Sequence, residues 1–242
     1  MTPPFAVSPE APVEWALLQA RGDETIPFLQ GQLSCDVLTL RTGQSLDGLL
    51  LSPSGDVITS LECSSHPEGV DIVVRAEVAD ATLRALGRFL MRTRCELQLV
   101  GAGAGAYATV GEQVRRGEPG PLEFAPGVAA HTFGQDFVER HVSFSKGCYT
   151  GQELVGRLDS RGGRVPFHLA RVTGRDLEHM ASVVSRVGPV GDRALQGLTT
   201  AVVDDGFSAL ALVHRTLLDG QSVVVVDDVA IELLHDGARH AR

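Results

Sequence analysis

The stretch Lys146-Gly147-Cys148-Tyr149-Thr150-Gly151-Gln152-Glu153 decides how this chain is interpreted. Lys146 is the single lysine among 21 basic residues, and the string also holds one of four cysteines and one of two tyrosines. A lysine, unlike an arginine, changes its pKa readily when it is buried. A chain that otherwise uses arginine has therefore kept an ammonium group with an adjustable charge, two residues from a thiol.

The pattern inside the string predicts a helix that begins at Gly151. Thr150 and Glu153 have the spacing of a capping box, in which both side chains satisfy backbone N–H groups of the first turn. Tyr149 and Leu154 occupy the two positions of a hydrophobic staple. Residues 142–144 alternate like a short strand. These patterns together predict a turn between a strand and a helix, and residues 142–153 are called the elbow below.

Cys148 precedes the expected helix and is the candidate reactive thiol. The free N–H groups of a helix N-terminus and the ammonium of Lys146 both favour a thiolate, which is the nucleophilic form of cysteine. An inert cysteine that only fills space is the alternative. Glu153 is most simply a cap, and Gly147 and Gly151 are most simply turn residues.

The same string resembles the signature of the YgfZ family, folate-binding proteins implicated in making or maintaining iron–sulfur enzymes. The likeness runs from about residue 25 to 217. Its main segments are Leu154-Val155-Gly156-Arg157, Phe28-Leu29-Gln30-Gly31-Gln32-Leu33-Ser34-Cys35-Asp36 and Gly197-Leu198-Thr199-Thr200-Ala201.

This resemblance implies an α+β fold in two parts. Residues 1–160 would form a T-protein-like ring of antiparallel sheet and helices around a folate-type pocket, with room for two interleaved subdomains. Residues 161–242 would form a small C-terminal β-barrel. The implied cofactor is tetrahydrofolate or a related reduced folate, and the implied partners are that folate and iron–sulfur client enzymes or assembly factors.

The resemblance also implies a division of roles among the site residues. Cys148 would be the reactive thiol and Lys146 its electrostatic support. The residues that fix the elbow would be Gly147, Tyr149, Thr150, Gly151 and Glu153. The folate contacts would be Gln152, Arg157, Gln30 and Asp36.

A family with the same architecture, the glycine-cleavage T-protein aminomethyltransferases, supplies the competing function of a folate-dependent transferase or demethylase. In that family paired aspartates follow a glycine turn, and one serves the amine chemistry; the matching place here is Thr59-Ser60. In that family a glutamate binds the pteridine ring, because a carboxylate pairs bidentately with the amino-pyrimidine edge of the ring. The nearest match here is residues 114–117, which again lack the acid. We therefore expect modest folate affinity and no aminomethyl transfer. A binding module with an inert cysteine is a third interpretation.

Composition limits the number of domains and the kinds of partner that this chain can have. A chain of 242 residues with 43% hydrophobic content suits one or two domains, and its net charge of −9 without a basic block argues against nucleic acid as the primary partner. Four widely spaced cysteines without a C-x-x-C pair indicate neither a disulfide scaffold nor a metal or cluster held by the chain itself. No apolar run approaches the roughly 20 residues of a membrane helix and the start lacks a basic leader, so we expect no membrane association and a cytoplasmic location.

The remaining patterns predict secondary structure. We expect strands at 15–18, 46–51, 57–63 and 70–75, and helices at about 23–33 and 78–92. Five β-rich runs, at 167–172, 182–187, 195–203, 207–217 and 223–234, would make the barrel. Residues 101–106 fit a dinucleotide-loop formula, but residues 107–111 resemble a strand rather than the helix such a loop needs, so this site is rejected.

Overall fold

The computed structural model describes residues 7–124, 127–187, 198–204, 206–218 and 221–234. The chain divides into two compact units, each assembled from separate stretches of sequence. Unit 1 comprises Met1–Val13, Tyr107–Phe137 and Arg161–Arg242, and unit 2 comprises Glu14–Ala106 and Val138–Ser160. Unit 2 carries the elbow.

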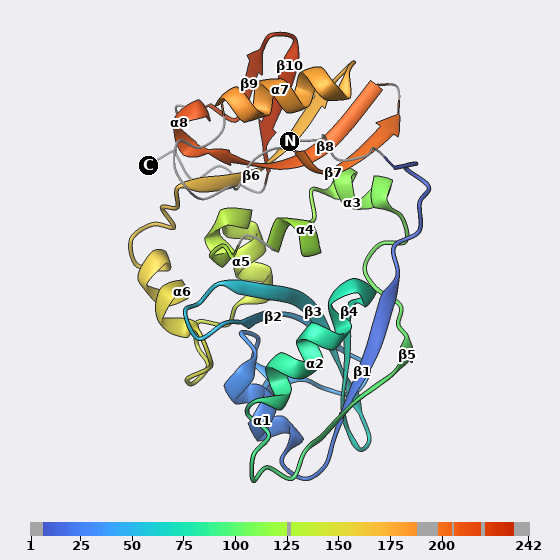
Figure 1. Ribbon diagram of the computed structural model, residues 1–242. Helices are drawn as coiled ribbons and strands as arrows, with labels where there is room; N and C mark the ends of the chain where they lie inside the picture. Colours follow the sequence, from blue (N-terminus) through green and yellow to red (C-terminus); the bar gives the residue numbers. More distant parts are fainter. Residues whose placement is uncertain (1–6, 125–126, 188–197, 205, 219–220, 235–242) are drawn as a thin grey trace. The chain divides into compact units, whose positions relative to one another are not determined.

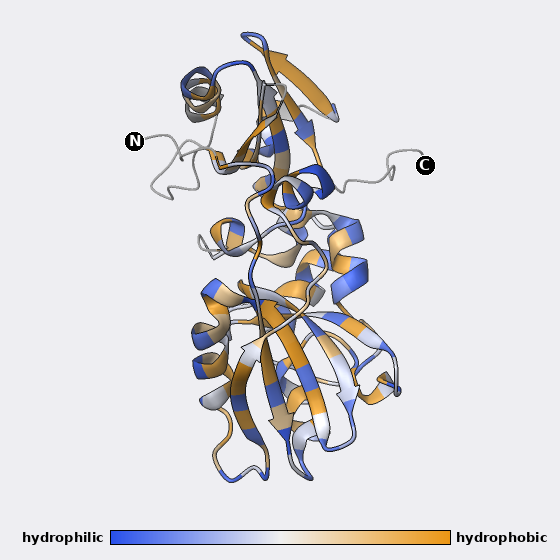
Figure 2. Cartoon of the chain, turned by 90° about the vertical axis from the view of Figure 1, so that its right-hand side faces the viewer, coloured by the Kyte–Doolittle hydropathy of each residue, from blue (hydrophilic) through white to orange (hydrophobic). Residues whose placement is uncertain are grey.

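Unit 2 is built on a five-stranded antiparallel sheet with the order β2-β3-β4-β1-β5 (Figure 1). Most alternate residues of β1, β3 and β4 are buried, and Figure 2 shows apolar and polar bands following one another along strands of this sheet. This period of two is what a strand with one buried face requires, and the four expected strands are confirmed. The strands are β1 (Trp15–Arg21), β2 (Ser45–Leu51), β3 (Val57–His66), β4 (Gly69–Arg75) and β5 (Glu96–Ala102).

Two helices pack on one face of this sheet. Phe28 and Leu29 of α1 (Thr25–Gln32) and Leu86 of α2 (Ala79–Gly87) join Leu18 and Ile72 of the strands in one buried core. Helix α2 is shorter than the expected 78–92, because it ends at a glycine, the poorest helix former after proline.

Unit 1 contains a second antiparallel sheet, with the order β7-β8-β6-β10-β9. Strands β7 and β9 stand at its two ends, so the expected closed barrel is not confirmed. Residues 195–197 of the third expected run lie outside the described residues. The strands are β6 (Phe167–Gly174), β7 (Leu198–Asp204), β8 (Gly206–His214), β9 (Val223–Val226) and β10 (Val229–Leu233).

The expected strand at 182–187 is instead part of helix α7 (Leu177–Val187). Met180, Val183 and Val184 are buried against Val172 and Ile231 of the sheet. Their spacings of three and four place them on one helical face. The run is apolar because this face is buried, not because it pairs as a strand.

The expected strand at 107–111 is also wrong, because helix α3 (Val110–Arg116) begins there. Thr109 is its N-cap: the Thr109 hydroxyl accepts a hydrogen bond from the N–H of Glu112 at 3.2 Å. The Glu112 carboxylate in turn accepts one from the N–H of Ala108 at 3.0 Å. This reciprocal arrangement closely resembles a capping box.

The remaining elements are short. Helices α3 and α4 contact β7 and β8 within unit 1. Among the described residues, no helix is long and apolar enough to span a membrane. These elements are α4 (Pro121–Phe124), α5 (Gln135–His141), α6 (Gln152–Asp159), α8 (Arg215–Leu218) and the 3-10 turns η1 (Val37–Thr39), η2 (Ala76–Val78) and η3 (Ala130–Phe133).

Candidate functional site at the elbow

Helix α6 begins one residue later than expected, at Gln152, and the expected capping box of Thr150 and Glu153 is wrong. Gly151 is the N-cap residue with a left-handed φ of 81°, and no side chain caps it. The amide oxygen of Gln152 reaches back to the N–H of Tyr149 at 3.2 Å. Glu153 is exposed in the first turn, where its charge favours the helix dipole.

Thr150 faces helix α1 instead of capping α6. Its N–H donates to the carbonyl of Gly31 at 3.0 Å, and its hydroxyl donates to the amide oxygen of Gln32 at 3.2 Å. The left-handed backbone at Gly151 turns the chain between Thr150 and the helix, which removes Thr150 from the cap. Thr150 therefore attaches the elbow to the end of α1.

Residues 142–144 do not form the expected strand. This segment is instead attached through Ser34, a fully buried residue that the sequence reasoning did not single out. The Ser34 hydroxyl donates to the carbonyl of His141 at 2.7 Å and accepts from the N–H of Leu49 at 2.7 Å. Its carbonyl accepts from the N–H of Ser143 at 2.9 Å. The sequence offers one indication that Ser34 is important, which is its position in the YgfZ-like segment 28–36.

Lys146 binds the last turn of α1 and the chain that follows it. Its ammonium donates to the carbonyl oxygens of Gln30 at 2.7 Å, Leu33 at 2.6 Å and Cys35 at 2.8 Å. An ammonium has three N–H donors, so this set satisfies all of them. Burial lowers the pKa of Lys146, while the charges of Cys35 and Asp36 act in the opposite direction.

Tyr149 packs beside the Lys146 ammonium and is partly buried, whereas Cys148 is exposed. The Lys146 nitrogen lies 5.0 Å from the centroid of the Tyr149 ring, within the range of a cation–π contact. Burial raises the pKa of Tyr149 to about 12. Cys148 is exposed, whereas Cys35, Cys63 and Cys95 are buried. The elbow thus exposes the Cys148 thiol at the surface, while Lys146 fixes the same segment through hydrogen bonds to the carbonyls of α1 and the chain after it.

Two glycines allow the elbow to touch the turn between β2 and β3. A Cβ atom on Gly151 would lie 2.5 Å from the carbonyl oxygen of Ser52, and one on Gly55 would overlap the side chain of Leu154. Gly55 also has a positive φ of 90°. Only a residue without a side chain fits either place, so both glycines fix the position of the elbow.

The expected folate contacts are only partly brought together. The side-chain amide of Gln30 donates to the carboxylate of Asp36 at 2.8 Å, and both residues are half-buried. The Gln30 carbonyl joins this pair to Lys146. Gln152 begins α6 with its amide oxygen already bonded, and Arg157 is exposed on the same helix.

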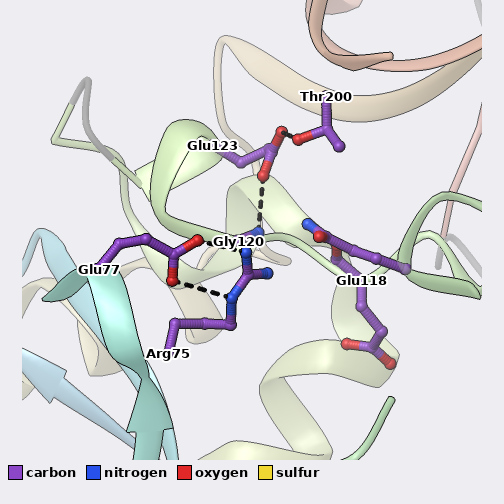
Figure 3. A network of polar contacts seen from close by, with 7 residues as sticks. Arg75, Glu77, Glu118, Gly120, Glu123 and Thr200 are labelled. Carbon is purple, nitrogen blue, oxygen red and sulfur yellow. Dashed lines mark hydrogen bonds and ion pairs between the residues drawn. The ribbon is translucent and has the colours of Figure 1, made fainter. Parts of the chain in front are cut away.

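Two acids of unit 1 were missed by the sequence reasoning. Glu118 directly follows Gly117, one residue beyond the segment compared with the T-protein glutamate. Glu123 is fully buried and accepts hydrogen bonds from the N–H of Gly120 at 2.6 Å and the hydroxyl of Thr200 at 2.8 Å (Figure 3). Burial raises the pKa of Glu123. No pattern in the sequence distinguishes this glutamate from a surface acid.

Among the described residues, no group of three or more His, Cys, Asp or Glu side chains is arranged to hold a metal ion.

Comparison with known sequences supports the resemblance drawn from the elbow. No family model matches the chain. Eight curated relatives match, all named tRNA-modifying protein YgfZ. The chain is 24% identical to the Yersinia enterocolitica protein, over 96% of the chain and 93% of the relative, and 23% identical to the Photobacterium profundum protein, over 62% of the chain. The resemblance to the YgfZ family is thereby confirmed.

Some of these matches span only part of the relative. The chain spans 65% of the Photobacterium profundum protein, and the 30% identical match to the Sodalis glossinidius protein spans 23% of that protein. Among solved structures, the aminomethyltransferase T of the glycine cleavage system from Bartonella henselae has the same fold. Its TM-score is 0.56 at 12% identity, over 94% of this chain and 86% of that chain. The expected T-protein-like α+β fold is confirmed at this level.

Proposed function

We propose that this chain is a YgfZ-like protein that binds a reduced folate and uses the thiol of Cys148 to support the synthesis or repair of iron–sulfur enzymes. The observation that carries the proposal is the contrast between an exposed Cys148 and the internally bonded Lys146 two residues before it. An exposed thiol can reach a client protein, and a fixed backbone presents it in one position. Lys146 is a positioning residue in this proposal.

Asp36 is the residue best suited to hold the pteridine. Within the described part of the chain its carboxylate accepts one hydrogen bond, from Gln30, whereas an ionised carboxylate offers about four lone-pair sites. The capacity that remains suits the amino-pyrimidine edge of a folate, which donates two parallel N–H groups. Gln30 would orient Asp36, while Gln152 and the exposed Arg157 would contact other parts of the ligand.

Calorimetric titration of the full chain with tetrahydrofolate tests this part. Heat of binding and a rise in the unfolding temperature are expected, because a ligand at 100 times its Kd adds about 2.7 kcal/mol of stability. Asp36→Asn should weaken the binding, and Asp159→Asn, at the exposed end of α6, is the matched control. No heat and no thermal shift at millimolar folate would exclude folate binding.

The transferase alternative makes the opposite prediction about turnover. Thr59 is buried in β3, and its hydroxyl donates to the carbonyl of Ser60. Neither residue offers the carboxylate that the amine chemistry needs. We expect no methylene-tetrahydrofolate from an aminomethyl donor, and measurable formation of that product would favour the transferase. The third alternative, an inert binding module, would have been favoured by a buried Cys148, and Cys148 is exposed.

A second candidate function comes from the name of the relatives, which describes them as tRNA-modifying. A net charge of −9 argues against this chain holding tRNA as its main ligand. We propose that any such role is exercised through a client enzyme. A gel-shift titration with tRNA at physiological salt tests this, and specific binding by the isolated chain would favour direct action on the RNA.

A further inference from the structure

Two buried thiols lie on the same face of the unit 2 sheet. Gly48 of β2 is opposite Leu61 of β3. A Cβ atom on Gly48 would lie 3.4 Å from Cδ1 of Leu61 and 2.6 Å from Sγ of Cys35. The sulfur of Cys35 therefore occupies the space that a side chain at position 48 would take. Cys63 is two residues beyond Leu61 in β3, so its side chain points to this same face.

The strand register brings these thiols together. Cys63 is opposite Leu46, which makes it the diagonal neighbour of Gly48, where the Cys35 sulfur lies. Cys35 is 4% exposed and Cys63 is 0% exposed, and both belong to one core cluster. In β2, a glycine at position 48 keeps this place open for sulfur.

The two thiols differ in their surroundings. A hydrogen bond with Cys63 lowers the pKa of Cys35 against the effect of burial, and the charge of Lys146 lowers it further. The same hydrogen bond, followed by burial, raises the pKa of Cys63. Of the two thiols, Cys35 is therefore the one whose surroundings favour the thiolate, and Cys63 the one whose surroundings favour the protonated form. The Lys146 ammonium lies 2.8 Å from the carbonyl oxygen of Cys35.

We propose that Cys35 and Cys63 form an oxidisable dithiol, a second thiol site separate from Cys148, whose oxidant is a small hydroperoxide. Cys35 is the attacking sulfur and Cys63 the resolving one. The proposal does not depend on folate binding or on the role of Cys148. It gives a chemical use to two cysteines that the elbow chemistry leaves unassigned.

The reaction balances in two steps. The Cys35 thiolate attacks one oxygen of hydrogen peroxide, the O–O bond breaks, and Cys35 becomes a sulfenic acid as hydroxide leaves. The Cys63 sulfur then attacks the Cys35 sulfur, an S–S bond forms and the S–O bond breaks. The proton of Cys63 leaves in one water, and the hydroxide takes up the proton that Cys35 released when it ionised, so two thiols and one peroxide give one disulfide and two waters. Lys146 of the elbow donates a hydrogen bond to the carbonyl of Cys35. Formation of the Cys35–Cys63 disulfide therefore involves a residue whose backbone is bonded to the elbow.

Peptide mapping of the full chain tests the proposal. The reduced protein is treated with stoichiometric hydrogen peroxide, then denatured in N-ethylmaleimide and digested. We expect a peptide pair joined through Cys35 and Cys63, both protected from the maleimide, while Cys95 is labelled. Dithiothreitol should restore labelling. Full labelling of Cys35 and Cys63 while Cys148 is oxidised, or a disulfide that contains Cys148, would overturn the proposal.

Two variants separate the steps. Cys63→Ser should leave a sulfenic acid on Cys35 that dimedone traps, with complete loss of the disulfide. Gly48→Ala displaces the Cys35 sulfur and should slow closure. Gly87→Ala should close like the unchanged protein, because the added carbon meets nothing within 4 Å apart from its chain neighbours and its own helix backbone. A folded Gly48→Ala protein that closes at the unchanged rate would count against the geometry. If Gly48→Ala does not fold, the peptide mapping of the unchanged chain after peroxide treatment decides whether Cys35 and Cys63 form the disulfide.

Discussion

The ammonium nitrogen of Lys146 lies 2.8 Å from the carbonyl oxygen of Cys35, a residue 111 positions earlier in the chain. Two further carbonyls, of Gln30 and Leu33, complete its set of acceptors. The lysine that the sequence pairs with Cys148 is thus bonded to backbone from another part of unit 2. Its electrostatic support of the Cys148 thiol remains a prediction.

Lys146→Met should destabilise the protein, because three carbonyls lose their donor. An unsatisfied buried polar group costs about 1–3 kcal/mol, and since Lys146 is half-buried, water will replace part of the loss. We expect a total decrease of about 1–3 kcal/mol in the free energy of unfolding, with Lys146→Arg retaining part of the stability. Urea denaturation measures this. Arg157→Met, on the exposed face of α6, is the control, and an equal loss in both variants would contradict the assigned role.

Cys148 should be the fastest cysteine to react with iodoacetamide, because the other three are buried. Peptide mapping after brief alkylation at several pH values measures the order of labelling. If the Lys146 charge supports the thiolate, Lys146→Met should slow alkylation near neutral pH, and Lys146→Arg should recover part of the rate. Faster labelling of Cys35, Cys63 or Cys95, or an unchanged rate in folded Lys146→Met, would mean that the elbow only supports folding.

Gly151→Ala and Gly156→Ala should have opposite effects on stability. At Gly151 an added carbon meets the Ser52 carbonyl at a φ of 81°, so we expect a loss of more than about 1 kcal/mol. At Gly156, inside α6, the added carbon meets nothing within 4 Å apart from its chain neighbours and its own helix backbone, so alanine should add about 0.5–1 kcal/mol. Denaturant midpoints of the two variants measure the difference. Similar midpoints would show that the contact with the β2–β3 turn does not constrain the elbow.

Thr109→Ala should cost more than Thr150→Ala. Thr109 caps α3, and loss of such a cap costs about 0.5–2 kcal/mol. Thr150 caps no helix, and its hydroxyl makes bonds of 3.2 and 3.5 Å to α1. Thr109→Ser, which keeps the capping hydroxyl, is the control for Thr109→Ala. Thermal unfolding of these variants would refute the assignment if Thr150→Ala proved the more damaging.

Glu123 should make stability fall as pH rises. Because burial raises its pKa, the folded protein keeps the Glu123 proton at pH values where the unfolded chain has released it. The folded state then binds more protons, and stability decreases from about pH 4 upward until Glu123 ionises in the fold. Glu123→Gln carries no charge, so its stability relative to the unchanged protein should increase over this range. Thermal unfolding across pH is the measurement, with Glu153→Gln as an exposed control; a difference that stays constant with pH would exclude the effect.

The sequence predicts the elements whose pattern matches their burial. Strands β1, β3 and β4 bury alternate residues because one face of the sheet is buried. Strand β2 ends in a run of buried residues, and the sequence predicts it as one arm of a hairpin around Pro53-Ser54-Gly55. The run 182–187 in α7 predicts a strand because Val183 and Val184 are β-branched, and its helical period shows only when Met180 is included. Tertiary packing rather than propensity decided that segment.

The candidate site was predictable only as far as it is local. The eight-residue string identified Lys146 and Cys148, since their rarity and spacing are visible in the sequence. The acceptors of Lys146 lie 111 to 116 positions away, and nothing in their residue types marks them, because the bonds are made to backbone carbonyls. The predicted N-cap at Thr150 is wrong for a related reason, because the start of α6 depends on the left-handed backbone at Gly151.

The distance in sequence between Lys146 and its acceptors also bears on how the chain is made. On the ribosome, all five strands of the unit 2 sheet are complete once Ala102 has been added, more than 40 residues before Lys146. The carbonyls of Gln30, Leu33 and Cys35 are then without this donor until the elbow emerges from the exit tunnel. The sheet can therefore form early during translation, but the loop after α1 reaches its final state only when the segment that carries Cys148 has been synthesised.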